Sequence, residues 1–124
     1  MKIIITESQY KRILREEEEQ KVLRIPSLKF FNDDWDLLQK FLELKGNPPY
    51  TIGGDLDLYR LPVKSLGNLQ SVEGDLGLEH TPIKSLGNLT SVGRDLNLIK
   101  TPLSRKYTEK HIRQMVDVGN EIYF

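Results

Sequence analysis

Residues 53–72 read GGDLDLYRLPVKSLGNLQSV, residues 73–92 read EGDLGLEHTPIKSLGNLTSV, and residues 93–103 begin a third copy with GRDLNLIKTPL. The repeat length is 20 residues. The copies align one column of aspartates, two of leucines and one of prolines: Asp55, Asp75 and Asp95; Leu56, Leu76 and Leu96; Leu58, Leu78 and Leu98; Pro62, Pro82 and Pro102. Self-similarity at a fixed period of this length is typical of a solenoid, in which each coil buries its apolar row against the next coil.

Each copy contains a D-L-x-L run, in which apolar and polar side chains alternate. Alternation of this kind predicts a strand with one buried face, so the leucines should point inward. Proline and the Gly67-Asn68 and Gly87-Asn88 pairs mark the return of the chain. We therefore expect one short strand per coil, and a single short parallel sheet.

The core L-x-L-x-x-T-P-I of the second copy resembles the leucine-rich-repeat core LxLxxNxL. Thr81 and Thr101 stand where that family has asparagine, and Leu61 does so in the first copy. The repeats are most similar to short, glycine-rich variants from bacteria and phages, and the opening MKIIITESQYKRIL resembles openings of uncharacterised bacteriophage proteins. The resemblance implies an α/β solenoid with a parallel sheet, and it does not specify a function.

The chain of 124 residues is predicted to form a single domain of three parts. Residues 1–52 are interpreted as an amino-terminal helical cap, residues 53–103 as three leucine-rich-repeat-like repeats, and residues 104–124 as a helix followed by a last strand. Short solenoids need such caps because their end coils otherwise expose the core.

Within the amino-terminal cap, the sequence predicts a strand over residues 2–5 and a helix from Thr6 to about residue 22. A second strand is expected over residues 27–31, with Leu28 and Phe30 inward. Asn32 or Asp33 should then begin a helix that runs to about Lys45, where Gly46 ends it. Its apolar stripe should comprise Trp35, Leu37, Leu38, Phe41 and Leu42, with Trp35 as a buried anchor against the first repeat.

The carboxyl-terminal part should begin with a helix that Thr108 caps, with Ile112, Met115 and Val116 as its apolar side chains. The final residues EIYF are predicted to join the repeat sheet as its last strand. Ile122 and Phe124 lie 26 residues after Leu96 and Leu98. Both are therefore expected to be buried.

The composition of the chain makes several kinds of partner and location less favourable. Lys plus Arg and Asp plus Glu both number 18, so no net charge favours nucleic acid or an anionic membrane as a partner. Cysteine is absent, and no segment has the length of a signal peptide core or of a membrane span. We expect a cytoplasmic protein, in the host cell if a phage encodes it, although a place in the virion stays open.

Catalytic and metal-binding patterns are not found. His80 and His111 are isolated, and no phosphate-binding or dinucleotide-binding glycine motif occurs. The sequence therefore predicts no catalytic residue, no metal ligand and no cofactor. The aspartate column is interpreted as capping backbone amides where each strand begins, in preference to binding calcium, because calcium rolls repeat at a shorter period.

The outward side of the strands is the predicted partner-binding face, since leucine-rich-repeat proteins commonly bind partners there. The residues expected to contact a protein partner are Asp55, Asp57, Tyr59, Asp75, Glu79, Asp95, Asn97 and Ile99. These features indicate a non-enzymatic interaction module, for example a phage-encoded accessory protein or an inhibitor of a host protein. Two alternatives stay open: a virion component that self-associates through its sheet edges, and a metal-dependent enzyme of unrecognised type. It is also open whether the carboxyl-terminal segment covers Ile99.

Overall fold

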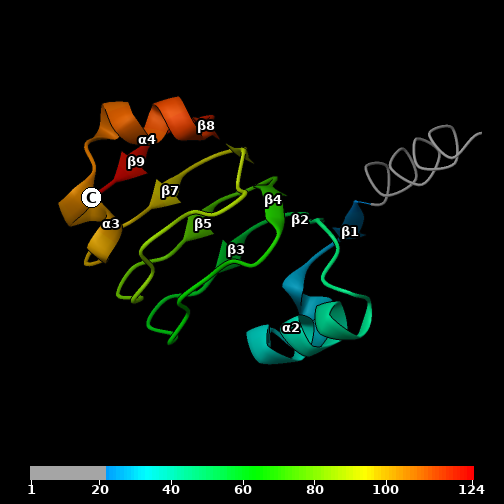
Figure 1. The fold of residues 1–124 in the computed structure, drawn as a ribbon. Coiled ribbons are helices and arrows are strands. Elements are labelled where there is room, and N and C mark those ends of the chain that lie inside the picture. Colours follow the sequence, from blue (N-terminus) through cyan, green and yellow to red (C-terminus); the bar gives the residue numbers. More distant parts are fainter. Residues whose placement is uncertain (1–21) are drawn as a thin grey trace, which may run out of the picture.

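The computed structural model describes residues 22–124 (Figure 1). The predicted strand at residues 2–5 and nearly all of the helix expected from Thr6 lie outside these residues. The elements in chain order are β1 (Leu23–Ile25), the 3-10 helix η1 (Leu28–Phe31), α2 (Trp35–Leu44), β2 (Tyr50–Ile52), β3 (Leu56–Asp57), β4 (Leu69–Val72), β5 (Leu76–Gly77), β6 (Ser91–Val92), β7 (Leu96–Asn97), α3 (Pro102–Lys106), α4 (Glu109–Met115), β8 (Asp117–Val118) and β9 (Ile122–Tyr123).

The fold is mixed α/β with two sheets, and every strand pair in them is parallel. One sheet has the order β1-β2-β4-β6-β8 and the other has the order β3-β5-β7-β9. The expectation of one strand per coil and a single sheet is therefore wrong. The N-L-x-S-V end of a repeat does not simply return the chain, because its Leu69 and Val72 are both buried and delimit a second strand.

The strand registers follow the repeat length. Leu76 pairs with Leu56 and with Leu96, and Val92 pairs with Val72, so paired residues are 20 positions apart. The aligned leucines of the D-L-x-L runs are all fully buried, which confirms that they point inward. The apolar side chains of both sheets belong to one continuous core. The hydrophobic effect thus acts on the same positions in each copy.

Two threonines of the repeats, Thr81 and Thr101, are buried with their hydroxyl groups hydrogen-bonded. The Thr81 hydroxyl donates to the Leu78 carbonyl at 2.8 Å, and the Thr101 hydroxyl donates to the Leu98 carbonyl at 2.6 Å. Both side chains are almost fully buried. Burial of a hydroxyl is tolerated here because its hydrogen bond is made within the same turn.

The amino-terminal part differs from the prediction. The strand expected at residues 27–31 is the 3-10 helix η1, in which Leu28 is buried but the Phe30 side chain is 73% exposed. The Ser27 side chain accepts a hydrogen bond from the Lys29 amide and begins this turn. The strand of this region is instead β1, which pairs with β2.

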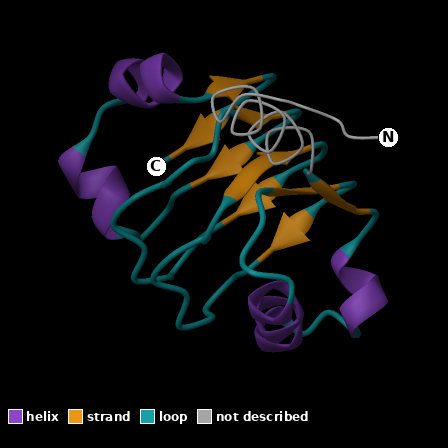
Figure 2. Cartoon of the chain, turned by 45° about the vertical axis from the view of Figure 1, so that its right-hand side comes forward, coloured by secondary structure: helices purple, strands orange, loops and turns teal. Residues whose placement is uncertain are grey.

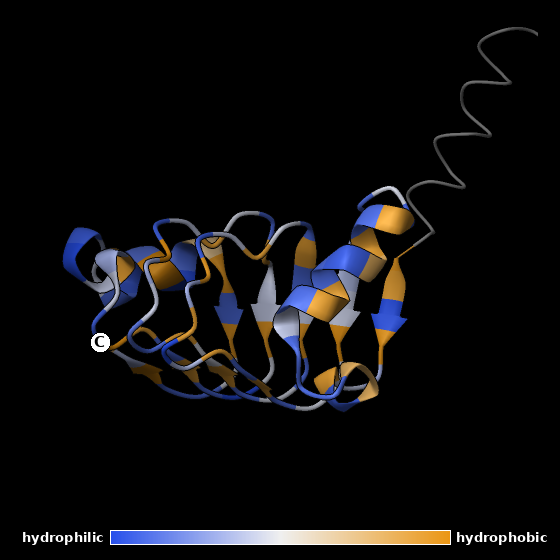
Figure 3. Cartoon of the chain, turned by 90° about the horizontal axis from the view of Figure 1, so that it is seen from below, coloured by the Kyte–Doolittle hydropathy of each residue, from blue (hydrophilic) through white to orange (hydrophobic). Residues whose placement is uncertain are grey.

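Helix α2 begins after Asp34, whose carboxylate accepts the Leu37 amide, and not after Asn32 or Asp33. Those two residues have φ values of 56°, which are incompatible with a helical turn. Trp35 is buried as predicted, whereas Leu37 of the predicted apolar stripe is exposed. Figure 3 shows hydrophobic and hydrophilic residues alternating along this helix.

The carboxyl-terminal part confirms the main predictions and corrects two of them. Thr108 caps α4, and Ile122 of β9 pairs with Leu96 of β7 and is buried. Phe124, which was predicted to be buried, is 42% exposed, and Met115 of the predicted apolar stripe is 47% exposed. Helix α3 and strand β8 were not predicted; α3 begins where the Thr101 hydroxyl accepts the Ser104 amide and Pro102 occupies the first turn.

The helices lie toward the two ends of the strand stack. Helix α2 lies near β1 and β2, and α3 and α4 lie near β7, β8 and β9 (Figures 1 and 2). None of the helices in residues 22–124 combines the length and apolar character needed to cross a membrane.

Candidate functional site

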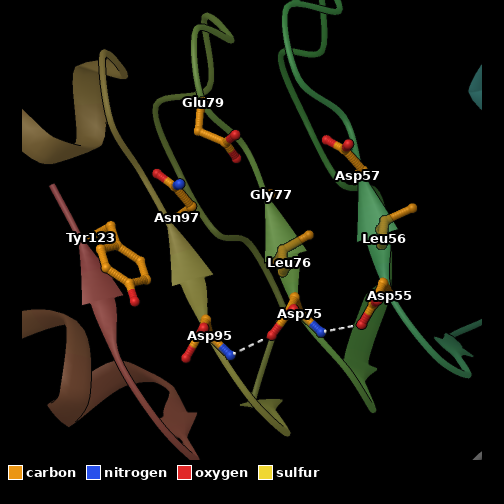
Figure 4. Close-up of a pocket in the computed structure, with 10 residues that line it drawn as sticks. All are labelled: Asp55, Leu56, Asp57, Asp75, Leu76, Gly77, Glu79, Asp95, Asn97 and Tyr123. Carbon is orange, nitrogen blue, oxygen red and sulfur yellow. Dashed lines mark hydrogen bonds between the residues drawn. The ribbon is translucent and has the colours of Figure 1, made fainter.

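A hollow of about 280 Å³ lies on the outward side of the β3-β5-β7-β9 sheet (Figure 4). We call this side the strand face. The residues that line the hollow are Asp55, Leu56, Asp57, Asp75, Leu76, Gly77, Glu79, Asp95, Asn97 and Tyr123. They come from the four strands and from the residues next to them, and no residue of α2, α3 or α4 is among them.

One edge of the hollow is the aspartate column. The Asp75 amide donates to Oδ1 of Asp55 at 2.8 Å, and the Asp95 amide donates to Oδ1 of Asp75 at 2.9 Å. Figure 4 shows both bonds as dashed lines. The Glu121 amide continues the column by donating to Asp95 at 3.1 Å. The aspartates therefore cap amides at strand entries, as the sequence predicted, and each carboxylate is fixed by a bond to the next strand of the sheet.

The middle of the hollow is a row of residues paired across the sheet: Asp57, Gly77, Asn97 and Tyr123. Asp57 and Asn97 each accept the amide two residues further along, at 3.0 and 3.1 Å. Gly77 has no side chain, and the carboxylate of Glu79 lies over this position. A Cβ atom on residue 77 would lie only 2.7 Å from Oε1 of Glu79.

The hollow is strongly acidic. Five carboxylates line it and no lysine or arginine does: they belong to Asp55, Asp57, Asp75, Glu79 and Asp95. Within residues 22–124, none of these carboxylates forms an ion pair, and the described ion pair is between Arg113 and Glu109 on α4. The negative charge of the hollow is thus not neutralised by a neighbouring side chain of the described part of the chain.

Six of the eight predicted partner-binding residues line this hollow, and Tyr59 and Ile99 do not. The Tyr59 side chain is 45% exposed, with its ring 5.5 Å from the His80 ring and with the Arg60 guanidinium 5.2 Å from its centroid. Ile99 is partly buried. Tyr123 and Gly77 were not predicted as site residues. The alternation in EIYF, with Ile122 inward, could have placed Tyr123 on the strand face.

A second hollow of about 370 Å³ lies at the start of α2. It also contains acidic side chains, those of Asp33, Asp34 and Asp36, but Lys64 lines it as well. The indole of Trp35 forms part of its wall and is buried. This hollow therefore has an internal positive charge that the strand face lacks.

In residues 22–124, no group of three or more histidine, aspartate or glutamate side chains is arranged to hold a metal ion. His80 lies in an exposed turn with a φ of 58°, and His111 lies in α4, with Nδ1 2.9 Å from the Thr108 hydroxyl.

The chain matches no protein-family model. Comparison with curated proteins and with solved structures finds no match either.

Proposed function

We propose that the protein is a short leucine-rich-repeat-like solenoid, closed at its ends by helical caps, that binds another protein through its strand face. The observation that carries this proposal is the hollow on that face, which spans four paired strands. The constant register of 20 residues supports the solenoid, because each coil is placed on the previous one by the same contacts.

The strand face is suited to recognition because its polar groups are held in place before a partner arrives. Asp55, Asp75 and Asp95 are fixed by backbone amides, and so are Asp57 and Asn97. A preorganised surface loses little conformational freedom on binding. Tyr123, which lines the hollow, is 44% exposed, and tyrosine is enriched at protein interfaces.

The proposal is of a binding protein and not of an enzyme, acting in the cytoplasm of the cell that contains it. If a phage encodes it, the partner is a host protein that it inhibits or a phage protein that it assists. Both roles use the same face, so one experiment tests them together.

The test compares partner capture by the native protein and by two triple variants, using lysate of the cells in which the protein acts. The strand-face variant carries Asp57→Lys, Glu79→Lys and Tyr123→Ala, at three residues that line the hollow. The matched control carries Asp36→Lys, Glu43→Lys and Leu44→Ala, which makes the same types of change at exposed positions of α2. Circular dichroism melts verify that both variants fold.

We expect the native protein and the α2 variant to capture the same partner, and the strand-face variant to lose it. Loss of the partner from the α2 variant alone would move the binding surface to that helix. Capture by all three proteins would also contradict the proposal. If none captures a partner, light scattering should show a monomer; a concentration-dependent oligomer would instead support self-assembly.

A further inference from the structure

We propose that the partner inserts a lysine or arginine side chain into the strand-face hollow, over Gly77. This inference rests on the proposed function and names the chemistry of the partner. The bound segment is an extended, basic stretch of a protein, with its cation among the carboxylates of Asp57, Asp75 and Glu79.

Charge is the first reason. The five carboxylates of the hollow have no lysine or arginine among them, and in the described part of the chain none is ion-paired. Like charges gathered without a counterion repel one another, and a cation from outside relieves that repulsion. The hollow at α2 provides the comparison, because there Lys64 already lies among the aspartates.

Shape is the second reason. Gly77 is the one member without a side chain in a row whose other members are Asp57, Asn97 and Tyr123 (Figure 4), so the Glu79 carboxylate can lie over it. The position that a Cβ would take is 3.2 Å from Oδ1 of Asp57 and 2.7 Å from Oε1 of Glu79. A ligand atom above Gly77 therefore lies close to two carboxylates from different repeats. The Tyr123 ring adds an aromatic wall that attracts cations.

Repulsion among the carboxylates of the hollow should make the free protein less stable. The backbone carbonyl of Glu79 accepts the Arg60 amide, but the Glu79 carboxylate makes no hydrogen bond or ion pair in the described part of the chain, so its charge adds repulsion without a compensating contact. Glu79→Gln should leave the melting temperature unchanged or raise it while it weakens binding. If Glu79 served only to stabilise the fold, Glu79→Gln would lower the melting temperature and leave binding unchanged.

The test uses the full-length protein labelled with ¹⁵N, and two probes: a hexalysine peptide and a hexaglutamine peptide. Amide resonances of Gly77, Asn97 and Tyr123 should shift with hexalysine and not with hexaglutamine, and raising the salt concentration should weaken the effect. The double variant Asp57→Asn and Glu79→Gln should weaken hexalysine binding about tenfold, because it removes two charge pairs.

The matched control is the double variant Asp33→Asn and Asp36→Asn in the α2 hollow, which removes the same number of charges elsewhere. It should bind hexalysine as the native protein does. A third variant, Gly77→Ala, should fold because the Glu79 side chain can move aside and Asp57 has to shift only slightly, yet weaken hexalysine binding by displacing the Glu79 carboxylate.

Three results would overturn the inference. One is an equal loss of hexalysine binding in the α2 control, which would indicate unspecific attraction. Another is an equal response to hexaglutamine, which would show a peptide-binding face with no preference for cations and would leave the proposed function intact. The third is no shift on the strand face with either peptide. In that case the capture experiment decides separately whether the strand face binds a partner of different chemistry.

Discussion

At the scale of single residues, Asp75 shows how one side chain joins neighbouring repeats. Its Oδ1 atom accepts the Asp95 amide, and its own amide donates to Asp55. The amide of Asp95 is partly buried, so it needs an acceptor that water does not fully provide. A short acidic or amide side chain at this position meets that need in every copy, which explains why aspartate recurs in the repeat.

We predict that Asp75→Ala lowers the free energy of unfolding by about 1–2 kcal/mol, because it leaves the Asp95 amide without its acceptor. Asp75→Asn keeps an oxygen at the same place and should retain most of the stability. Urea unfolding of both variants measures the difference. An equal loss in both would mean that the charge, and not the hydrogen bond, stabilises the repeat.

Tyr50 is a second residue whose role is local and testable. Its hydroxyl donates to the Leu66 carbonyl at 2.7 Å and accepts from Nε2 of Gln39 at 3.3 Å. Burial raises the pKa of Tyr50 from 10.0 to about 12, although the hydrogen bond from Gln39 acts in the opposite direction. The phenol therefore stays neutral in the folded protein at a pH where it ionises in the unfolded chain.

Because the folded pKa of Tyr50 is the higher one, its contribution to stability is complete below about pH 10 and is lost as the pH rises toward 12. Between pH 10 and pH 12 we expect ionisation of Tyr50 to lower the free energy of unfolding by about 1.4 kcal/mol per pH unit. Urea unfolding at several alkaline pH values checks it. The same series on Tyr50→Phe should be less steep, and identical slopes would refute the assignment.

At the scale of elements, the last strand buries Ile122 and leaves Phe124 exposed, although the sequence pattern predicts the same direction for both side chains. Ile122 faces the core opposite Leu96, whereas Phe124 comes after the end of β9 and is 42% exposed. The alternation of the strand predicts both inward, but the sheet pairing ends at Tyr123. Beyond the last pair, nothing fixes the direction of a side chain.

Ile122→Ala should therefore lower the free energy of unfolding by about 2 kcal/mol, the low end for a buried isoleucine. Phe124→Ala should change it by less than about 1 kcal/mol, as is usual for an exposed position. Chemical denaturation compares the two. A larger effect of Phe124→Ala would show that the strand continues to the end of the chain.

In the 3-10 helix η1, local hydrogen bonds determine the structure although the sequence pattern predicts a strand. Residues 27–31 read as a strand because Leu28 and Phe30 alternate with polar residues. The Ser27 hydroxyl caps the turn, and Asn32 and Asp33 adopt positive φ values, so the segment forms η1 instead. Small polar side chains bond to nearby amides and compete with strand pairing.

At the scale of the whole molecule, the constant offset between paired strands makes the repeat a unit that can be added. A second copy of residues 73–92 inserted after Val92 should fold, because each strand finds a partner in the same register. The added surface should raise the urea m-value by about one sixth, in proportion to 20 residues added to 124.

The control is the same insert with the copy of Gly74 deleted. It should be clearly less stable, since a slip of one residue turns the following leucines out of the core. Urea unfolding and circular dichroism distinguish the two proteins. Equal stability of both inserts would show that the register is not fixed by the repeat.

The sequence by itself determined the repeat and four features that depend on it or on local capping: the inward leucines, the capping role of the aspartates, the helix after Thr108 and the pairing of Ile122 with Leu96. These features arise from periodicity and local hydrogen bonding, which are visible in one chain. The sequence also indicated six residues of the strand-face hollow.

Only the tertiary structure decided that each repeat supplies strands to two sheets, and that Tyr59 and Ile99 lie outside the hollow. The sequence pattern placed Gly77 in an outward row with Asp57 and Asn97, but only the tertiary structure decided that the carboxylate of Glu79 lies over Gly77. A pattern gives the direction of each side chain from its own strand. The shape and charge of a surface depend on which strands lie side by side, and that is fixed by contacts between distant residues.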